Sequence, residues 1–204
     1  MSGDYAARRL AAIKEAAFAV LAEKGYKAAS MLEIARRAKA SNETLYKWFG
    51  NKQALFAALV EDNAREAREL LEAALAEGGD PLDTLSRLGP ILLAVVTGEK
   101  AVALNRAAAG DVFETATLGR TIADNGRETI LPLLVSLFER MARDGSLAVA
   151  DPGEAAETFI NLLIGDLQIR RVIGVAQMPN QSEMTARGAR AVAQIRLIFD
   201  PDRR

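Results

Sequence analysis

Residues 30–49 read SMLEIARRAKASNETLYKWF, and they hold two short helical patterns with a brief connection between them. Ser30 and Glu33 have the spacing of a capping box, in which the serine oxygen and the glutamate carboxylate satisfy exposed N–H groups at a helix start. Ser41 can cap a second helix that runs through Phe49. Two short helices joined by a tight turn predict a helix-turn-helix, the motif that places its second helix in the major groove of DNA.

Helical patterns also flank this motif on both sides. From Tyr5 to Lys24, apolar residues recur at helical spacing, and Gly25 then gives a stop signal. On the other side, Asn51 can cap a much longer helix that extends to about residue 77, with leucines on one face and i,i+4 charge pairs on the other. We therefore expect three helices with a core of their own, followed by a long fourth helix.

The charge of the chain is divided unevenly. Residues 1–52 hold 10 Lys or Arg against 5 Asp or Glu, a net charge of +5, and residues 53–204 hold 16 against 22, a net charge of −6. A basic first part on an acidic remainder favours a DNA-contacting domain at the start of the chain. Charge alone agrees equally well with chance variation among solvated faces.

Composition limits the class of protein. Half of the residues are apolar and only six are proline, a balance that favours an all-α fold. The chain has no cysteine and no histidine, so disulfides, thiolate chemistry and the usual zinc and haem ligands are excluded. We expect no metal and no cofactor, and the absence of Gly-rich phosphate loops and of a G-x-S-x-G turn argues against an enzyme. Without a signal-peptide pattern or an apolar run of about 20 residues, we expect a cytoplasmic protein with no membrane partner.

Three short motifs stand in and around the helix-turn-helix. They are LEIA at 32–35, SxxTLYxWF at 41–49 and NKxxLF at 51–56. Together they resemble the DNA-binding signature of the TetR family of bacterial transcriptional regulators, over roughly residues 8–62. In that family a three-helix domain binds DNA, and a long fourth helix joins it to a divergent helical domain for ligand binding and dimerisation.

The resemblance implies a helix-turn-helix domain at 1–52, with the signature continuing into the linking helix 51–77, and a ligand-binding and dimerisation domain at 53–204. In the second domain, glycine, proline and aspartate signals separate further helical patterns. These patterns lie at about 82–97, 99–109, 112–124, 125–144, 152–173 and 183–199.

The resemblance also implies which residues contact DNA. Hydroxyl and ammonium groups beside a helix N-terminus suit phosphate oxygens, since they add to its exposed N–H groups. The residues implied for phosphate contacts are Ser30, Thr44, Tyr46, Lys47 and Lys52. Sequence readout would fall to Asn42, which can pair with adenine, and Glu43, which can accept from cytosine N4. The full predicted set is Ser30, Lys39, Ala40, Ser41, Asn42, Glu43, Thr44, Tyr46, Lys47, Trp48 and Lys52.

Each of these residues taken singly could instead serve only as a cap, a packing residue or a solvated charge. Many relatives have lysine and glycine where this chain has Asn42 and Glu43. That departure removes a positive charge from the recognition helix and implies a different operator, but it leaves the fold assignment intact because neither position belongs to the core.

Apolar and small residues along 152–173 and 183–199 predict a homodimer interface built from two helices of each protomer. Two-fold symmetry is expected because one recognition helix makes too few contacts by itself. The predicted interface residues are Phe159, Leu163, Leu167, Ala189, Val192, Ala193, Ile195 and Arg196. The same stripes could pack within the core of one protomer.

A pocket for a small apolar or amphipathic effector is expected among the helices of 82–144. Its predicted polar residues are Asn105, Arg106, Asn125 and Glu139, although the sequence favours a plain surface position for each of them. The expected function is that of a transcriptional repressor. It binds double-stranded operator DNA, and the effector releases it from the DNA by shifting the population toward a conformation that does not bind. The alternatives are a DNA-binding protein with a nucleoid or division role, and a helical bundle that uses its basic part on an acidic protein.

Overall fold

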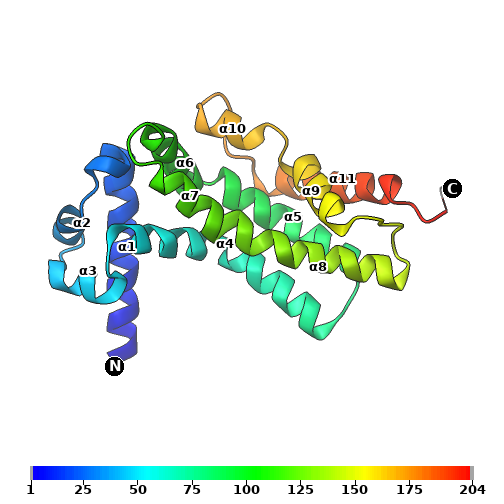
Figure 1. Ribbon diagram of the computed structural model, residues 1–204, viewed down its shortest axis with the longest axis horizontal. Coiled ribbons are helices and arrows are strands. Elements are labelled where there is room, and N and C mark those ends of the chain that lie inside the picture. Colours follow the sequence, from blue (N-terminus) through cyan, green and yellow to red (C-terminus); the bar gives the residue numbers. More distant parts are fainter. Residues whose placement is uncertain (1, 203–204) are drawn as a thin grey trace. The chain divides into compact units, whose positions relative to one another are not determined.

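The computed structural model describes residues 2–202, and every regular element within them is helical (Figure 1). The elements are α1 (Ser2–Ala28), α2 (Met31–Arg37), α3 (Asn42–Phe49), α4 (Lys52–Glu77), α5 (Pro81–Thr97), α6 (Glu99–Asp111), α7 (Thr117–Ile122), the π-helical turn η1 (Ala123–Arg127), α8 (Glu128–Asp144), α9 (Pro152–Ile164), α10 (Leu167–Val172) and α11 (Gln181–Ile198). The predicted all-α fold is therefore confirmed.

The chain forms two compact units. The first unit contains the residues up to Asn63 together with Glu99–Gly126, and the second contains Ala64–Gly98 together with Arg127–Arg204. Helix α4 contributes its first half to one unit and its second half to the other. This division differs from the sequence-based one at residue 52, because α6 packs against α1 and brings the following turn and α7 into the first unit.

The first unit has its own core, to which each of its α-helices contributes buried residues. Helix α1 contributes the stripe that its periodicity predicted, α2 and α3 contribute one face each, and α4, α6 and α7 complete the cluster. Fully buried members are Ile13, Ala17, Val20, Ile34, Leu45, Leu55, Phe56 and Leu118. Gly25 takes a φ of 74° and kinks α1, which then continues for one short turn to Ala28. The predicted stop is thus a kink followed by a turn.

The second unit is arranged around α5, which packs against α8, α9, α10 and α11 (Figure 1). Its contact with α11 is very close, since a Cβ built on Gly89 would lie 2.8 Å from the Cα of Gly188. Two glycines facing each other therefore allow the backbones of α5 and α11 to touch.

The predicted helix at 152–173 is broken into α9 and α10. Gly165 adopts a φ of 52°, and the Arg187 side chain donates hydrogen bonds to the carbonyls of Leu163 and Ile164, the latter at 2.9 Å. An arginine from another helix thus satisfies carbonyls at the end of α9. The apolar pattern continues through Gly165, and for this reason the sequence analysis predicted one helix where the structure has two.

No single helix among residues 2–202 is long and apolar enough to cross a membrane; only α5 and α6, taken together as a bent pair, reach that length and composition. The apolar side of α5 is buried in the core of the second unit.

Candidate nucleic-acid interface

Serine caps begin both helices of the helix-turn-helix. Ser30 Oγ accepts a hydrogen bond from the N–H of Glu33 at 3.2 Å, and Ser41 Oγ accepts one from the N–H of Thr44 at 3.1 Å. The Glu33 carboxylate does not form the predicted second half of a capping box with Ser30; instead it accepts from Lys24 Nζ at 2.6 Å. The charge of Lys24 draws the glutamate away from the helix start and ties α2 to α1.

The two faces of α3 differ sharply. Leu45 is fully buried in the core of the first unit and Phe49 packs against it, so both hold the helix in place. The opposite face carries exposed Asn42, Glu43 and Lys47, together with Tyr46 and Trp48, which are 50% and 38% exposed. Polar and aromatic side chains on α3 are therefore accessible to a partner.

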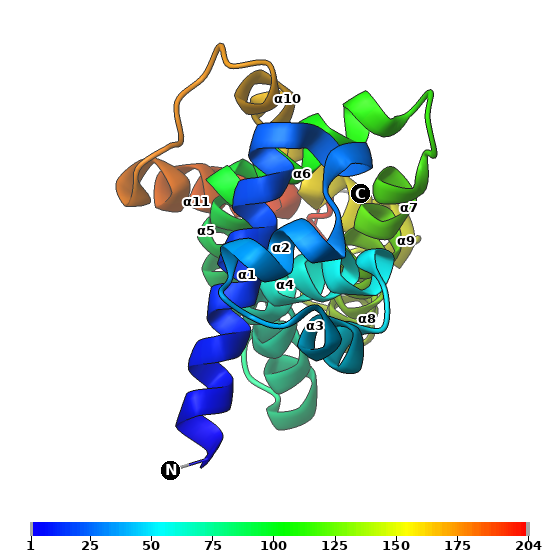
Figure 2. The same ribbon diagram turned by 90° about the vertical axis from the view of Figure 1, so that its left-hand side faces the viewer.

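The turn before α3 completes this surface. Lys39 is exposed and adopts a φ of 52°, and Ala40 is half-buried against the core. Thr44 is half-buried and its hydroxyl lies 2.7 Å from that of Ser41, so both hydroxyls sit at the start of α3. The sequence-predicted residues from Lys39 to Trp48 therefore lie together on α3 and the turn before it; Figure 2 shows α2 and α3 side by side.

Lys52 differs from the other predicted phosphate-binding residues, because it is already engaged within the first unit. Its ammonium donates to the carbonyl of Tyr26 at 2.9 Å and lies 4.1 Å from the centroid of the Tyr26 ring. Burial lowers the pKa of Lys52, and the negative charge of Asp111 offsets part of that effect. Lys52 thus fixes the start of α4 against the end of α1, and only its remaining N–H groups could meet a phosphate.

Asp111 is a structural residue that the sequence analysis missed. Its side chain is only 2% exposed, and Oδ2 accepts hydrogen bonds from the Thr115 hydroxyl at 2.7 Å and from the N–H groups of Thr117 and Leu118 at 3.0 and 3.3 Å. The carboxylate therefore caps α7 from the end of α6. A helical pattern from 112 onward concealed this turn, and the run Thr115-Ala116-Thr117 after an aspartate was the available signal.

The four predicted effector-binding residues do not form one group. The amides of Asn105 and Asn125 donate to the carbonyls of Ala101 and Thr121, one helical turn back, at 2.8 and 2.9 Å. Arg106 is exposed beside a groove of about 550 Å³ between α1 and α6. These three residues belong to the first unit, whereas Glu139 is an exposed residue of α8 in the second.

Burial within the protomer separates the predicted dimer residues into two sets. Four of them, Phe159, Leu163, Val192 and Ile195, lie in the core of the second unit and offer a partner almost no surface. Their apolar stripe packs against the protomer's own α5 and α8, which is the alternative that the sequence left open. The residues that remain accessible are Ala189, Ala193 and Arg196 on the outer face of α11, and half-buried Leu167 at the start of α10.

A serine-capped helix-turn-helix on a small core, followed by a larger helical unit, defines the class of DNA-binding transcriptional regulators with a helix-turn-helix. Two family models match the chain: the bacterial regulatory proteins of the tetR family at residues 13–59, and the AefR-like transcriptional repressor C-terminal domain at residues 83–196. The second match covers more than half of the chain. The protein belongs to the TetR family.

Similar proteins agree with this assignment. The chain is 27% identical to the uncharacterised HTH-type transcriptional regulator YvkB of Bacillus subtilis over 83% of this chain and 87% of YvkB. Among solved structures, a TetR-family regulator from Mesorhizobium loti has a TM-score of 0.74 at 27% identity and covers 95% of this chain and 97% of its own. The flavonoid-responsive regulator FrrA has a TM-score of 0.71 at 26% identity, over 96% and 99% of the two chains.

Proposed function

We propose that this TetR-family regulator is a homodimeric repressor whose α3 helices read two operator half-sites about 34–36 Å apart, or a multiple of that spacing. The observation that carries the proposal is the exposed face of α3, with Asn42, Glu43 and Lys47 held outward by buried Leu45. Lys47 supplies charge for a phosphate, and Asn42 and Glu43 supply hydrogen-bonding groups that can distinguish bases.

Selection of bound sequences from a random duplex library at about 150 mM salt tests the proposal, since non-specific binding is weak under that condition. A palindromic motif would support a sequence-specific dimer and supply the operator. If a folded dimer enriches no sequence, the proposal is contradicted and a non-promoter role on DNA is favoured. If the affinity for DNA does not change with salt concentration, an acidic protein partner is favoured instead.

Two substitutions in α3 are expected to act differently. Lys47→Ala removes one phosphate contact from each protomer, so it should weaken binding to all DNA sequences alike and reduce the log–log salt slope of the dimer by about 1.8. Asn42→Ala removes a base contact, so it should relax the preference at one operator position by about 1–3 kcal/mol. Competition binding with operators mutated at each position measures both.

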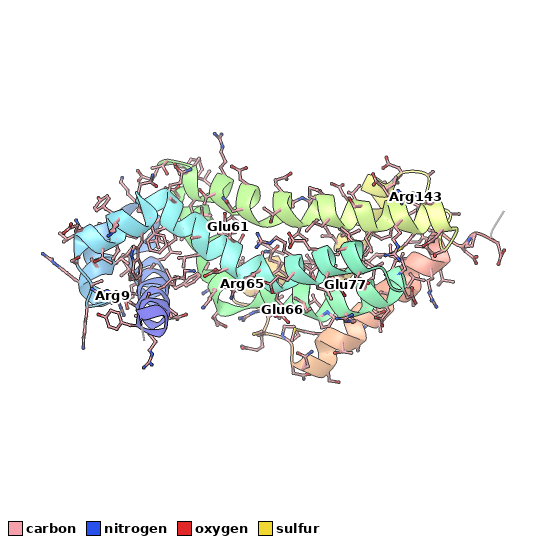
Figure 3. All side chains as sticks on the ribbon, turned by 90° about the horizontal axis from the view of Figure 1, so that it is seen from below. Arg9, Glu61, Arg65, Glu66, Glu77 and Arg143 are labelled. Atoms are coloured by element: carbon pink, nitrogen blue, oxygen red, sulfur yellow. The ribbon has the colours of Figure 1, made fainter. Side chains whose placement is uncertain are left out.

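Arg143→Ala is the matched control, because Arg143 is an exposed cation of α8 in the second unit (Figure 3). It should leave both the slope and the preference unchanged. If Lys47→Ala altered base preference and Asn42→Ala did not, the roles of the two residues would be exchanged.

We further propose a small amphipathic effector that binds in the second unit. An open groove of about 430 Å³ there is lined by apolar Leu93, Leu167, Met178 and Met184 and by the charged residues Glu183, Arg187 and Arg190. That volume lies within the usual range for small-ligand sites, and an arginine beside apolar walls suits a ligand with one anionic end. The name of FrrA, a flavonoid-responsive regulator, supports an aromatic or otherwise amphipathic ligand for this fold.

Arg190→Ala should therefore weaken release of the operator by anionic effectors and leave operator binding without effector unchanged. A panel of flavonoids and aliphatic carboxylates, scored by loss of operator binding in fluorescence anisotropy, provides the measurement. Equal sensitivity of the variant and the unchanged protein to every active compound would place the effector elsewhere.

A further inference from the structure

Tyr26 lies where the end of α1 meets the start of α4. It follows Gly25, whose φ of 74° kinks α1, and its side chain is only 4% exposed. Its ring packs edge-to-face with that of Phe56 on α4, with the ring centroids 5.4 Å apart and the ring planes at 68°. Tyr26 is therefore a core residue of the first unit that contacts the first turns of α4.

The same tyrosine holds the ammonium of Lys52 in two ways. Lys52 Nζ donates to the Tyr26 carbonyl at 2.9 Å, and it lies 4.1 Å from the centroid of the Tyr26 ring. The carbonyl belongs to the last turn of α1, where helical geometry provides few N–H partners for carbonyls. The ring adds a second attraction, because the face of an aromatic ring is negative and draws a cation. Lys52 and Phe56 are four residues apart on α4, so one tyrosine receives both side chains.

Lys52 keeps donor capacity after this contact. An ammonium carries three N–H groups, and one of them is directed at the Tyr26 carbonyl. The residue is half-buried, so part of its side chain remains in contact with solvent and with an anion that arrives there. A lysine that moves freely loses much rotamer freedom when it binds an anion, whereas a lysine that is already held in place loses less.

Lys52 also lies close to the recognition helix along the chain. Only Gly50 and Asn51 separate it from Phe49, the last residue of α3. Three consecutive peptide units span at most about 11 Å between Cα atoms. The major groove is about 12 Å wide, so phosphates at the edge of a groove that α3 occupies lie at a comparable distance. One duplex can therefore meet α3 and the Lys52 ammonium together.

We propose that Tyr26 is a positioning residue for DNA binding, whose ring face and carbonyl hold the Lys52 ammonium where it meets a phosphate beside the groove that α3 reads. The proposal rests on the proposed function, since it requires α3 to occupy the major groove. The family signature implies a phosphate contact for Lys52 and assigns no part in it to Tyr26. Tyr26 does not touch the DNA; it lowers the entropy that Lys52 loses on binding, and so it raises affinity without reading a base.

The test is a double-mutant cycle in the full-length protein, with affinity for the selected operator measured by fluorescence anisotropy at about 150 mM salt. Tyr26→Leu removes the ring and keeps both the carbonyl and an apolar core residue. It should weaken binding about 5- to 30-fold, the scale of the two cation–π contacts that a dimer contains. The same change in a Lys52→Ala background should have almost no effect, because the ammonium that the ring holds is gone. Tyr26→Phe should restore the affinity, since it brings back the ring face.

Phe18→Leu is the matched control, because Phe18 is also a buried aromatic residue of α1 with an ammonium over its ring, that of Lys100 at 5.1 Å. Any effect of Phe18→Leu on DNA binding should be equal with and without Lys52. Circular dichroism melts identify a temperature at which all variants are folded. If Tyr26→Leu does not fold, fluorinated phenylalanines at position 26 replace it, since fluorine weakens the negative ring face and keeps the ring in the core. Affinity should then fall with each added fluorine only where Lys52 is present.

The outcomes separate this proposal from the proposed function. An equal loss of affinity from Tyr26→Leu in both backgrounds overturns it, because Tyr26 would then act through the packing of the first unit, and the proposed function still stands. An operator affinity that Tyr26→Leu leaves unchanged, or that Tyr26→Phe does not restore, overturns it in the same way. A protein that binds no DNA at all overturns both.

Discussion

Gly89→Ala is expected to destabilise the second unit by about 1–3 kcal/mol, which is the usual cost of overpacking a close contact. The new methyl group would lie 2.8 Å from the Cα of Gly188 on α11 and 3.4 Å from Cδ1 of Leu163. The first of these neighbours is backbone and cannot move aside as a side-chain end can. The helices α5 and α11 must therefore separate, and their separation loosens the core that both of them line.

Helix propensity acts in the opposite direction, since alanine is favoured over glycine within a helix by about 0.5–1 kcal/mol. Gly110→Ala isolates that effect, because a Cβ at Gly110 in α6 meets no atom within 4 Å. Urea unfolding followed by far-UV circular dichroism should thus show Gly110→Ala as neutral or more stable and Gly89→Ala as less stable. Equal stability of the two variants would mean that α5 and α11 do not touch at this point.

The sequence predicted the three helices of residues 1–52 well because short-range signals determine them. Ser30 and Ser41 begin α2 and α3 through contacts within three residues, and Gly50 ends α3 with a φ of 78°. Leu45 and Phe49 are spaced to lie on one side of a short helix, so the exposed face follows from the buried one. The exposed face of α3 could therefore be predicted from its own residues alone.

Local signals do not predict the contacts of Lys52. Its spacing in the signature predicts a position at the start of α4, but the sequence does not predict that the Tyr26 carbonyl lies 2.9 Å from its ammonium. The same holds for Glu33, whose distant partner Lys24 prevails over the local partner at the helix start. Long-range pairing between charges is decided by packing, which a local pattern does not contain.

The dimer residues show a second limit, because an apolar stripe indicates that side chains leave water but not which chain covers them. Phe159 and Leu163 of α9, with Val192 and Ile195 of α11, pack within their own protomer. Of the residues that the same stripes predicted on α11, Ala189, Ala193 and Arg196 are exposed and so stay available to a partner chain. A third limit concerns breaks within a pattern. The helical pattern at 112–124 did not reveal that α7 begins only at Thr117, after a turn built on Asp111.

Asp111→Ala is expected to destabilise the first unit by about 1–3 kcal/mol, because it leaves N–H groups at the start of α7 without an acceptor. Oδ2 accepts from the Thr115 hydroxyl and from the N–H groups of Thr117 and Leu118. Thr115 is exposed and its hydroxyl can turn to water, but Leu118 is buried, so its N–H group cannot reach water unless the start of α7 unwinds. The single tryptophan, Trp48, lies in the first unit, so its fluorescence during urea unfolding reports on this unit.

Asp111→Asn isolates the charge, and acid dependence tests it. Burial raises the pKa of the Asp111 carboxyl, but hydrogen bonds from Thr115, Leu118 and Thr117 outweigh burial and hold the pKa below its ordinary value of 3.8. A carboxyl whose pKa is lower in the folded state stabilises it fully above the unfolded pKa, and this contribution disappears as the pH falls through the folded pKa. The stability difference between the unchanged protein and Asp111→Asn should therefore be constant near neutral pH and shrink only below about pH 4. A difference that stayed constant to the lowest pH at which the protein folds would show that the shape of the side chain, and not its charge, caps α7.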